Sequence, residues 1–160
     1  MPYVGVVIGS NSDVPLIQDA LTVLSDLGID HEFNTISAHR TPQKAADYAQ
    51  AAAERGIEVI IAGAGGSAAL PGVIAGWTDL PVIGVPLPSS ELNGIDSLYS
   101  IVQMPPGMPV ATVGVDRGDN AGALAVQILA TSNDSLAAAY VDYRSAMTAK
   151  VISDDESIQG

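Results

Sequence analysis

The residues best suited to chemistry lie in the stretch TISAHRTPQ, residues 35–43. There His39, one of two histidines in the chain, directly precedes Arg40, one of six basic residues. An imidazole titrates near neutral pH and can transfer a proton. A guanidinium group can hold a phosphate or carboxylate through paired, charge-assisted hydrogen bonds. The pair therefore predicts a site where Arg40 holds an anionic substrate and His39 acts on it, with an inert surface pair as the alternative; His31 is interpreted as structural.

Two further loops contain residue types that suit ligand binding. GSNSD (9–13) places hydroxyl groups and Asp13 where a strand turns into a helix. Free N–H groups and the helix dipole at such a turn favour an anion, and Asp13 has the chemistry to accept hydrogen bonds from a ribose diol. The alternative is that Ser12 or Asp13 only caps the helix. GAGGSA (63–68) matches the dinucleotide fingerprint weakly, because the next strand does not end in an acidic residue; its glycines allow close approach of a ligand or a neighbouring subunit.

The elements that must position these loops alternate between short apolar runs and helical stretches. Strands are predicted at 3–9, 31–36, 58–63, 81–86 and 109–115, and helices at 13–27, 42–56, 67–77, 94–104, 118–131 and 134–149. Thr41 and Pro42 give the second helix its start. Strands separated by helices form right-handed crossovers and a parallel sheet covered on both faces. The pattern predicts an α/β, flavodoxin-like three-layer αβα sandwich with strand order 2-1-3-4-5 and an extra C-terminal helix.

In that strand order the loops after the first three strands are neighbours. Open parallel sheets bind ligands at the carboxyl ends of their strands, near the point where the strand order reverses. The three unusual loops therefore meet at the edge of the sheet where a ligand is expected. The sequence predicts a binder of a phosphate and a sugar with one acid–base histidine, and it contains no recognisable cofactor motif or spacing of metal ligands.

Composition limits the other possibilities. The 160 residues predict one domain over 1–150 and a disordered acidic tail over 151–160. A net charge of −12 argues against a nucleic-acid partner, and reflects either adaptation to high salt or ordinary acidic solubility. The absence of cysteine and of a basic leader fits a cytoplasmic protein. The uncharged run 59–78 is rich in glycine, which favours a strand, loop and short helix over a membrane span.

Several longer stretches resemble a known family in order and spacing over about residues 3–131. They are GSNSD, SAHRTP, VIIAGAGGSAALPG, LPVIGVP, GIDSLYSIVQMPPGMPVATV and DNAGALAVQILA. The chain resembles the purine-biosynthesis family PurE, the N5-carboxyaminoimidazole ribonucleotide mutase. The resemblance implies migration of a carboxylate from N5 to C4 of an aminoimidazole ribonucleotide through CO2, without metal, ATP or biotin. It also implies a homo-octamer.

The resemblance also implies roles for individual residues. His39 matches the general acid/base, Arg40 the phosphate-binding arginine, and Ser10 and Asp13 the substrate-binding loop. Ser37 lies in the same motif as Arg40 and is expected to assist at the phosphate. The glycine-rich loop is expected to close over the base and CO2, with substrate contacts from Gly65, Gly66, Ser67 and Ala68.

The chain departs from the family pattern in two places. The typical loop reads GGAAHLPG, whereas this chain has Ser67 in place of an alanine and Ala69 in place of a second histidine. The change leaves open a direct carboxylase that uses dissolved CO2, or a non-catalytic ribonucleotide-binding oligomer; a flavodoxin-like redox or signalling module is a further alternative. Arg117, in a segment that also differs from the family, is either a surface residue or part of a salt bridge between subunits.

Overall fold

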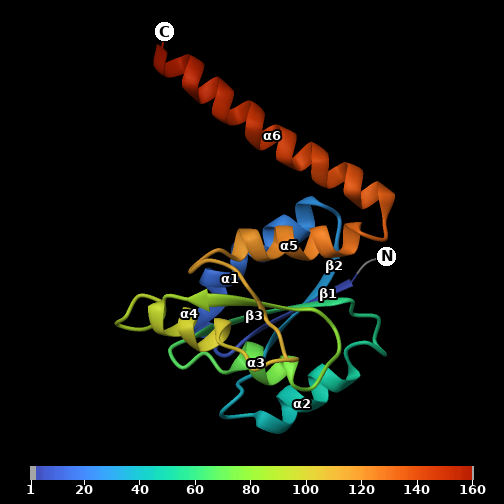
Figure 1. The fold of residues 1–160 in the computed structure, drawn as a ribbon, viewed down its shortest axis with the longest axis vertical. Coiled ribbons are helices and arrows are strands. Elements are labelled where there is room, and N and C mark those ends of the chain that lie inside the picture. The colour runs from blue at the N-terminus through green and yellow to red at the C-terminus, as the bar shows by residue number, and fades with distance from the viewer. Residues whose placement is uncertain (1–2, 160) are drawn as a thin grey trace.

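The computed structural model describes residues 3–159, which are built around one parallel sheet (Figure 1). The five strands follow the order β2-β1-β3-β4-β5. They span Tyr3–Ile8 (β1), Asp30–Thr35 (β2), Val59–Gly65 (β3), Val82–Leu87 (β4) and Ala111–Thr112 (β5). The predicted strand order and fold class are confirmed. The strand order reverses between β1 and β3, which is where a ligand site was expected.

Helices cover both faces of the sheet. They are η1 (Asn11–Asp13), α1 (Val14–Asp26), α2 (Pro42–Ala51), α3 (Leu70–Ala75), α4 (Ile95–Val102), α5 (Gly118–Ala130) and α6 (Asp134–Gln159). α1 and α5 pack on one face, where Val4, Val6 and Ile8 point into the core. α2 and α3 pack on the other face against Val7 and Ile60 (Figure 1). The alternation along β1 follows the two-residue period of a strand and produces the three layers.

The two helices on the first face approach each other closely through small side chains. A β-carbon on Gly122 of α5 would lie 2.9 Å from Cβ of Val23 and 3.0 Å from the carbonyl oxygen of Ala20, both in α1. Only glycine leaves room for this contact, because a methyl group at either distance would force the helices apart. The alanine- and glycine-rich composition thus serves close packing between layers.

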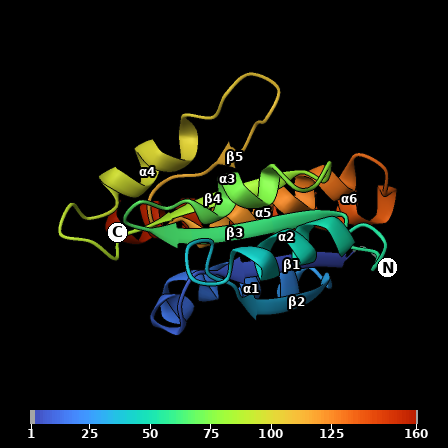
Figure 2. The ribbon, with the colours of Figure 1, turned by 90° about the horizontal axis from the view of Figure 1, so that it is seen from below.

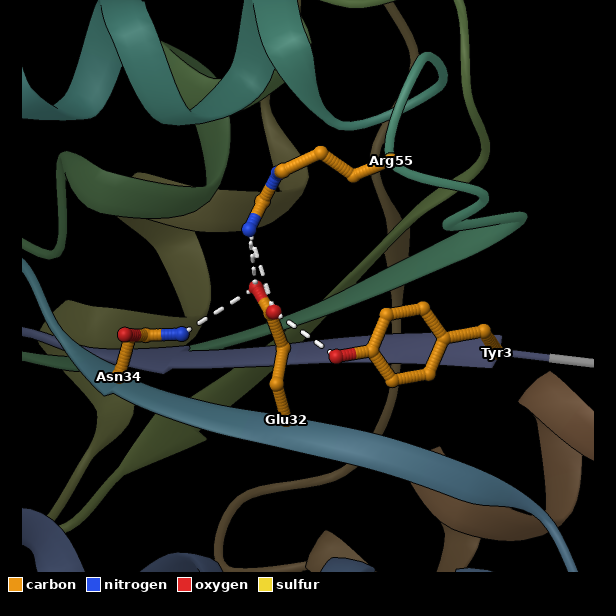
Figure 3. A network of polar contacts seen from close by, with 4 residues as sticks. All are labelled: Tyr3, Glu32, Asn34 and Arg55. Carbon is orange, nitrogen blue, oxygen red and sulfur yellow. Dashed lines mark hydrogen bonds and ion pairs between the residues drawn. The ribbon is translucent and has the colours of Figure 1, made fainter.

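A polar network joins β1, β2 and the turn before β3 (Figure 3). The carboxylate of Glu32 accepts hydrogen bonds from Tyr3 Oη at 2.9 Å, Asn34 Nδ2 at 3.2 Å and Arg55 Nη1 at 3.1 Å. The guanidinium of Arg55 also lies over the ring of Tyr48, 4.8 Å from its centroid. Burial acts to raise the pKa of Glu32, but the Tyr3 hydrogen bond and the Arg55 charge oppose it, and the pKa lies below its ordinary value.

Several elements are shorter than predicted, among them α2, which ends at Ala51 rather than at residue 56. β5 has two residues instead of the seven of 109–115, although hydrogen bonds from Val113 N to Gly84 O and from Asp116 N to Pro86 O continue beside β4. Pro109 has no N–H to donate, and β5 is an edge strand, so regular pairing is brief. α3 begins at Leu70 rather than at residue 67, because residues 66–69 form a loop against the cavity described below. α4 and the connection after it project beyond the β4–β5 side of the sheet (Figure 2).

The predicted disordered tail is wrong for residues 151–159, which continue α6 to Gln159. The polar, acidic composition suggested fraying, but residues 134–159 contain no glycine or proline to end the helix. Of α6 only Leu136 is buried, and the helix runs away from the sheet over about 39 Å at 1.5 Å per residue (Figure 1). Residue 160 lies outside the described residues.

The uncharged run 59–78 forms β3, the loop after it and α3. Over residues 3–159, none of the helices combines the length and the apolar character needed to cross a membrane.

Candidate active site

Four loops enclose a cavity of about 260 Å³ at the carboxyl ends of the strands. The loops follow β2, β1, β3 and β4, in their order along the sheet. The lining residues are Gly9, Ser10, Ser12, Asp13, Ser37, Ala38, His39, Arg40, Ala64, Gly65, Ser67, Ala68, Ala69, Leu70 and Ser89. The three loops singled out in the sequence therefore meet, and the predicted residues lie in one cavity, except for Gly66.

Arg40 is held by both neighbouring loops. Its Nη2 donates to the carbonyl of Gly9 at 3.1 Å, and its Nε donates to the hydroxyl of Ser37 at 3.2 Å. The ion pairs within residues 3–159 involve Arg55 and Arg117, so the guanidinium of Arg40 has no carboxylate partner there. An exposed, oriented guanidinium without a counter-ion, beside the hydroxyl of Ser37, is suited to binding an anion.

A second hollow adjoins the cavity on the β2 side. It has a volume of about 410 Å³ and is lined by Gly9, Ser10, Asn11, Thr35, Ser37, Arg40 and Thr41. Arg40 lies on the wall of both, so its charge reaches either space. Thr41 is the N-cap residue of α2, as predicted, but its hydroxyl exchanges hydrogen bonds with Ser37 (2.9 and 3.0 Å) instead of capping the helix. Thr41 thus stabilises the turn that carries His39.

His39 is exposed at the mouth of the cavity, in the turn between β2 and α2. Within residues 3–159 its ring forms no hydrogen bond to protein, so both ring nitrogens are free to bind a ligand. His31 differs, because its Nδ1 lies 3.0 Å from the carbonyl of Ile29 and it sits in β2 away from the cavity. The structural interpretation of His31 is consistent with that position.

Asp13 is the buried charged group of the site, with 6% of its surface exposed. Burial raises the pKa of its carboxyl group, although nearby Ser10, Ser12 and the Arg40 charge act to lower it. The carboxylate of Asp13 makes no capping hydrogen bond to α1. Ser10 caps the short helix η1, which precedes α1: its hydroxyl accepts from Ser12 N at 3.4 Å and from Ser12 Oγ at 3.0 Å. A buried carboxylate facing the cavity is suited to accepting hydrogen bonds from hydroxyl groups of a ligand.

The loop after β3 provides the wall opposite Arg40. Ala64, Gly65, Ser67, Ala68 and Ala69 line the cavity, whereas Gly66 lies in the same loop without lining it. Gly66 has φ +61° and Ala68 has φ +41°. The left-handed conformation is unfavourable for Ala68, which indicates that the loop is held in this shape by its surroundings.

Two lining residues were not singled out in the sequence: Leu70 and Ser89. Ser89 comes from the loop after β4, whose sequence LPSS contains no unusual charge. Its position after the fourth parallel strand could have indicated that it lies at the same edge of the sheet as the other loops.

Comparison with known proteins agrees with this geometry. The family model described as AIR carboxylase matches residues 3–150. The N5-carboxyaminoimidazole ribonucleotide mutase of Pyrococcus abyssi is 56% identical over 147 residues, which cover 92% of this chain and 84% of that protein. The mutase of Mycobacterium tuberculosis is 51% identical over 158 residues, covering 99% of this chain and 91% of that protein. The crystal structure of Treponema denticola PurE has a TM-score of 0.89 at 28% identity and covers 100% of both chains.

The chain belongs to the AIR carboxylase family.

The resemblance to PurE is thereby confirmed. One similar protein has a different name. The phosphoribosylaminoimidazole carboxylase of Schizosaccharomyces pombe is 49% identical over 158 residues, which cover 99% of this chain and 29% of that protein. The two residues of the glycine-rich loop that differ from the typical family sequence, Ser67 and Ala69, both line the cavity. Arg117 is exposed and forms an ion pair with Asp119 at the start of α5, within the same chain.

Proposed function

We propose that this protein is an isomerase of purine biosynthesis that converts N5-carboxyaminoimidazole ribonucleotide into 4-carboxy-5-aminoimidazole ribonucleotide. One observation carries the proposal: His39, with no protein hydrogen bond among residues 3–159, and Arg40, without a counter-ion there, flank one cavity together with the buried carboxylate of Asp13. Relatives that cover nearly the whole chain are named for this reaction.

The cavity offers a separate contact for each part of the substrate. Arg40 binds the phosphate, assisted by the hydroxyl groups of Ser37 and Ser10. Asp13 accepts hydrogen bonds from the ribose hydroxyls. The loop of residues 64–69 covers the imidazole and the CO2, because its glycines and alanines let backbone approach a flat ring closely.

The chemistry requires one proton to move while CO2 changes its attachment. The N5–carboxylate bond breaks, N5 gains a proton, and CO2 is released next to the ring. C4 then attacks CO2 with its electron pair, and loss of the C4 proton restores the aromatic ring. His39 can donate the proton to N5 and recover one from C4, so the histidine ends in the state in which it began. A closed pocket keeps CO2 within reach of C4.

A paired turnover assay tests the proposal. One arm supplies N5-carboxyaminoimidazole ribonucleotide with CO2 removed, and the other supplies 5-aminoimidazole ribonucleotide with abundant bicarbonate. We expect product in the first arm at low protein concentration. Product in the second arm alone would assign the chain to direct carboxylation, and none in either arm would leave a ribonucleotide-binding oligomer.

Replacing His39 with Asn tests the proton transfer. The amide keeps a hydrogen-bonding side chain but cannot take up a proton near neutral pH. We expect His39→Asn to abolish turnover and to leave the dissociation constant of the product within about twofold, as measured by calorimetry. Turnover that survives at the wild-type rate would remove His39 from the chemistry.

We also propose a cytoplasmic homo-octamer without a nucleic-acid or membrane partner. Apolar side chains on and beside α4 recur at helical spacing on an exposed face: Leu92, Ile95, Tyr99 and Val102. Further exposed apolar residues lie along α6, namely Val141, Met147, Val151, Ile152 and Ile158. Faces of this kind usually mark contacts between proteins. Sedimentation velocity would give the mass, and a monomer at micromolar concentration would refute the assembly.

A further inference from the structure

Ser89 occupies space at the cavity that exists only because residue 65 is glycine. Gly65 ends β3 and pairs with Leu87 at the end of β4, two residues before Ser89. A β-carbon on residue 65 would overlap the hydroxyl of Ser89 and lie 2.9 Å from its Cβ. The Ser89 side chain therefore packs directly against the backbone of Gly65, where it lines the cavity.

The hydroxyl of Ser89 is free for a ligand. Five serines line the cavity, and three of them already contact protein groups. Ser12 donates to Ser10, and Ser37 accepts from Arg40. Within residues 3–159, the hydroxyl groups of Ser67 and Ser89 have no hydrogen-bond partner.

The position of Ser89 along the sheet edge places it far from the phosphate anchor. The guanidinium of Arg40 lies against the carbonyl of Gly9 at the end of β1. Neighbouring strands are about 4.8 Å apart, and two spacings separate β1 from β4, which is roughly 10 Å. A ribonucleotide held by its phosphate at Arg40, in the loop after β2, extends its base toward the loops after β3 and β4. Ser89 thus lies at the end of the cavity where the carboxylated base belongs.

A carboxylate at that end needs neutral hydrogen-bond donors. The titratable residues that line the cavity are Asp13, His39 and Arg40, and Arg40 is engaged with the loops after β1 and β2. Ala69, on the wall after β3, has no side-chain donor. An ionised acceptor gains more from a hydroxyl donor than a neutral acceptor does.

We infer that Ser89 positions the substrate, its hydroxyl donating a hydrogen bond to the carboxylate of the carboxylated aminoimidazole ribonucleotide. The inference rests on the proposed function. Ser89 discriminates ribonucleotides that carry the carboxylate from 5-aminoimidazole ribonucleotide, which lacks it. It holds the carboxylate in one orientation at the ring and takes no part in the proton transfer.

Calorimetric binding of two ribonucleotides to the full-length protein tests the inference. The probes are 4-carboxy-5-aminoimidazole ribonucleotide and 5-aminoimidazole ribonucleotide, each titrated into wild type and Ser89→Ala. We expect Ser89→Ala to weaken binding of the carboxylated compound by tenfold to a hundredfold, the usual effect of removing a hydrogen bond to a charged group. Binding of the uncarboxylated compound should change by less than twofold. A purely structural role for Ser89 would weaken both equally.

Two matched variants make the result specific. Ser100→Ala removes the same atom from an exposed site on α4 and should leave both affinities unchanged. Ser67→Ala removes the other free hydroxyl. A selective loss in Ser67→Ala without one in Ser89→Ala would overturn the inference, as would equal or absent effects in Ser89→Ala. If the wild-type protein binds neither compound, the proposed function fails and the inference fails with it; wild-type binding without selectivity at Ser89 refutes the inference alone.

Discussion

Replacing Glu32 with Gln should destabilise the protein by an amount that depends on pH. The carboxylate accepts hydrogen bonds from Tyr3, Asn34 and Arg55 (Figure 3). The amide keeps the shape and one acceptor oxygen, but it loses the charge and replaces the other oxygen with a donor.

The magnitude follows from how exposed the partners are. The side chains of Arg55 and Glu32 are 41% and 21% exposed, so solvent screens the ion pair and its loss costs about 0.5 kcal/mol. Hydrogen bonds to a charged acceptor exceed those to a neutral one by about 1 kcal/mol. We therefore expect Glu32→Gln to lower the free energy of unfolding by about 1.5 kcal/mol at pH 7.

The pH dependence has a definite sign. The pKa of Glu32 is lower in the folded protein than in the unfolded chain. Its contribution is therefore complete above the unfolded pKa, near 4.3, and is lost as pH falls through the folded value. The difference between wild type and Glu32→Gln should shrink on acidification.

Urea denaturation at fixed protein concentration, at pH 7 and at stepwise lower pH, measures this difference. Glu58→Gln is the matched control, because Glu58 is exposed immediately before β3 and forms no ion pair within residues 3–159. We expect it to change stability by less than about 0.5 kcal/mol. Equal stabilities of the two variants at pH 7, or a difference that persists unchanged in acid, would refute the reasoning.

Three other substitutions probe the cavity. Asp13→Asn should stabilise folding at pH 7 and weaken ribonucleotide binding. Because burial raises the pKa of Asp13, the ionised carboxylate lowers stability above the unfolded pKa, and this cost is relieved as pH falls through the folded pKa. Thermal unfolding measured against pH will show the difference. Gly65→Ala should reduce turnover at least tenfold by displacing Ser89, whereas Gly76→Ala, whose nearest contact would be 3.5 Å, should leave it within twofold. Ala69→His adds a donor at the cavity wall and should tighten binding of the carboxylated product about tenfold, as for other hydrogen bonds to charged groups; unchanged affinity, rate and substrate preference would make the alanine a neutral replacement.

Much of the site could be read from the sequence because its signals are local. His39 and Arg40 are adjacent, their strand and helix are bounded by ordinary start and stop residues, and the period of apolar residues gives each strand its buried face. Once the strands are known to be parallel, their carboxyl ends must share an edge, so the loops after β1, β2 and β3 were placed together correctly.

Other features depend on contacts between distant segments, and only the tertiary structure decided them. The role of Ser89 arises because β4 pairs with β3 in a register that sets Leu87 against Gly65. The tail was predicted to be disordered because it is polar and acidic, but it contains no glycine or proline before residue 160 that would end the helix, and α6 continues to Gln159. Thr41 was correctly predicted at the start of α2, but its hydroxyl forms hydrogen bonds with the backbone of Ser37 and does not cap the helix. Local propensity determines where an element begins, but which partner a side chain finds there depends on the packing of the whole sheet.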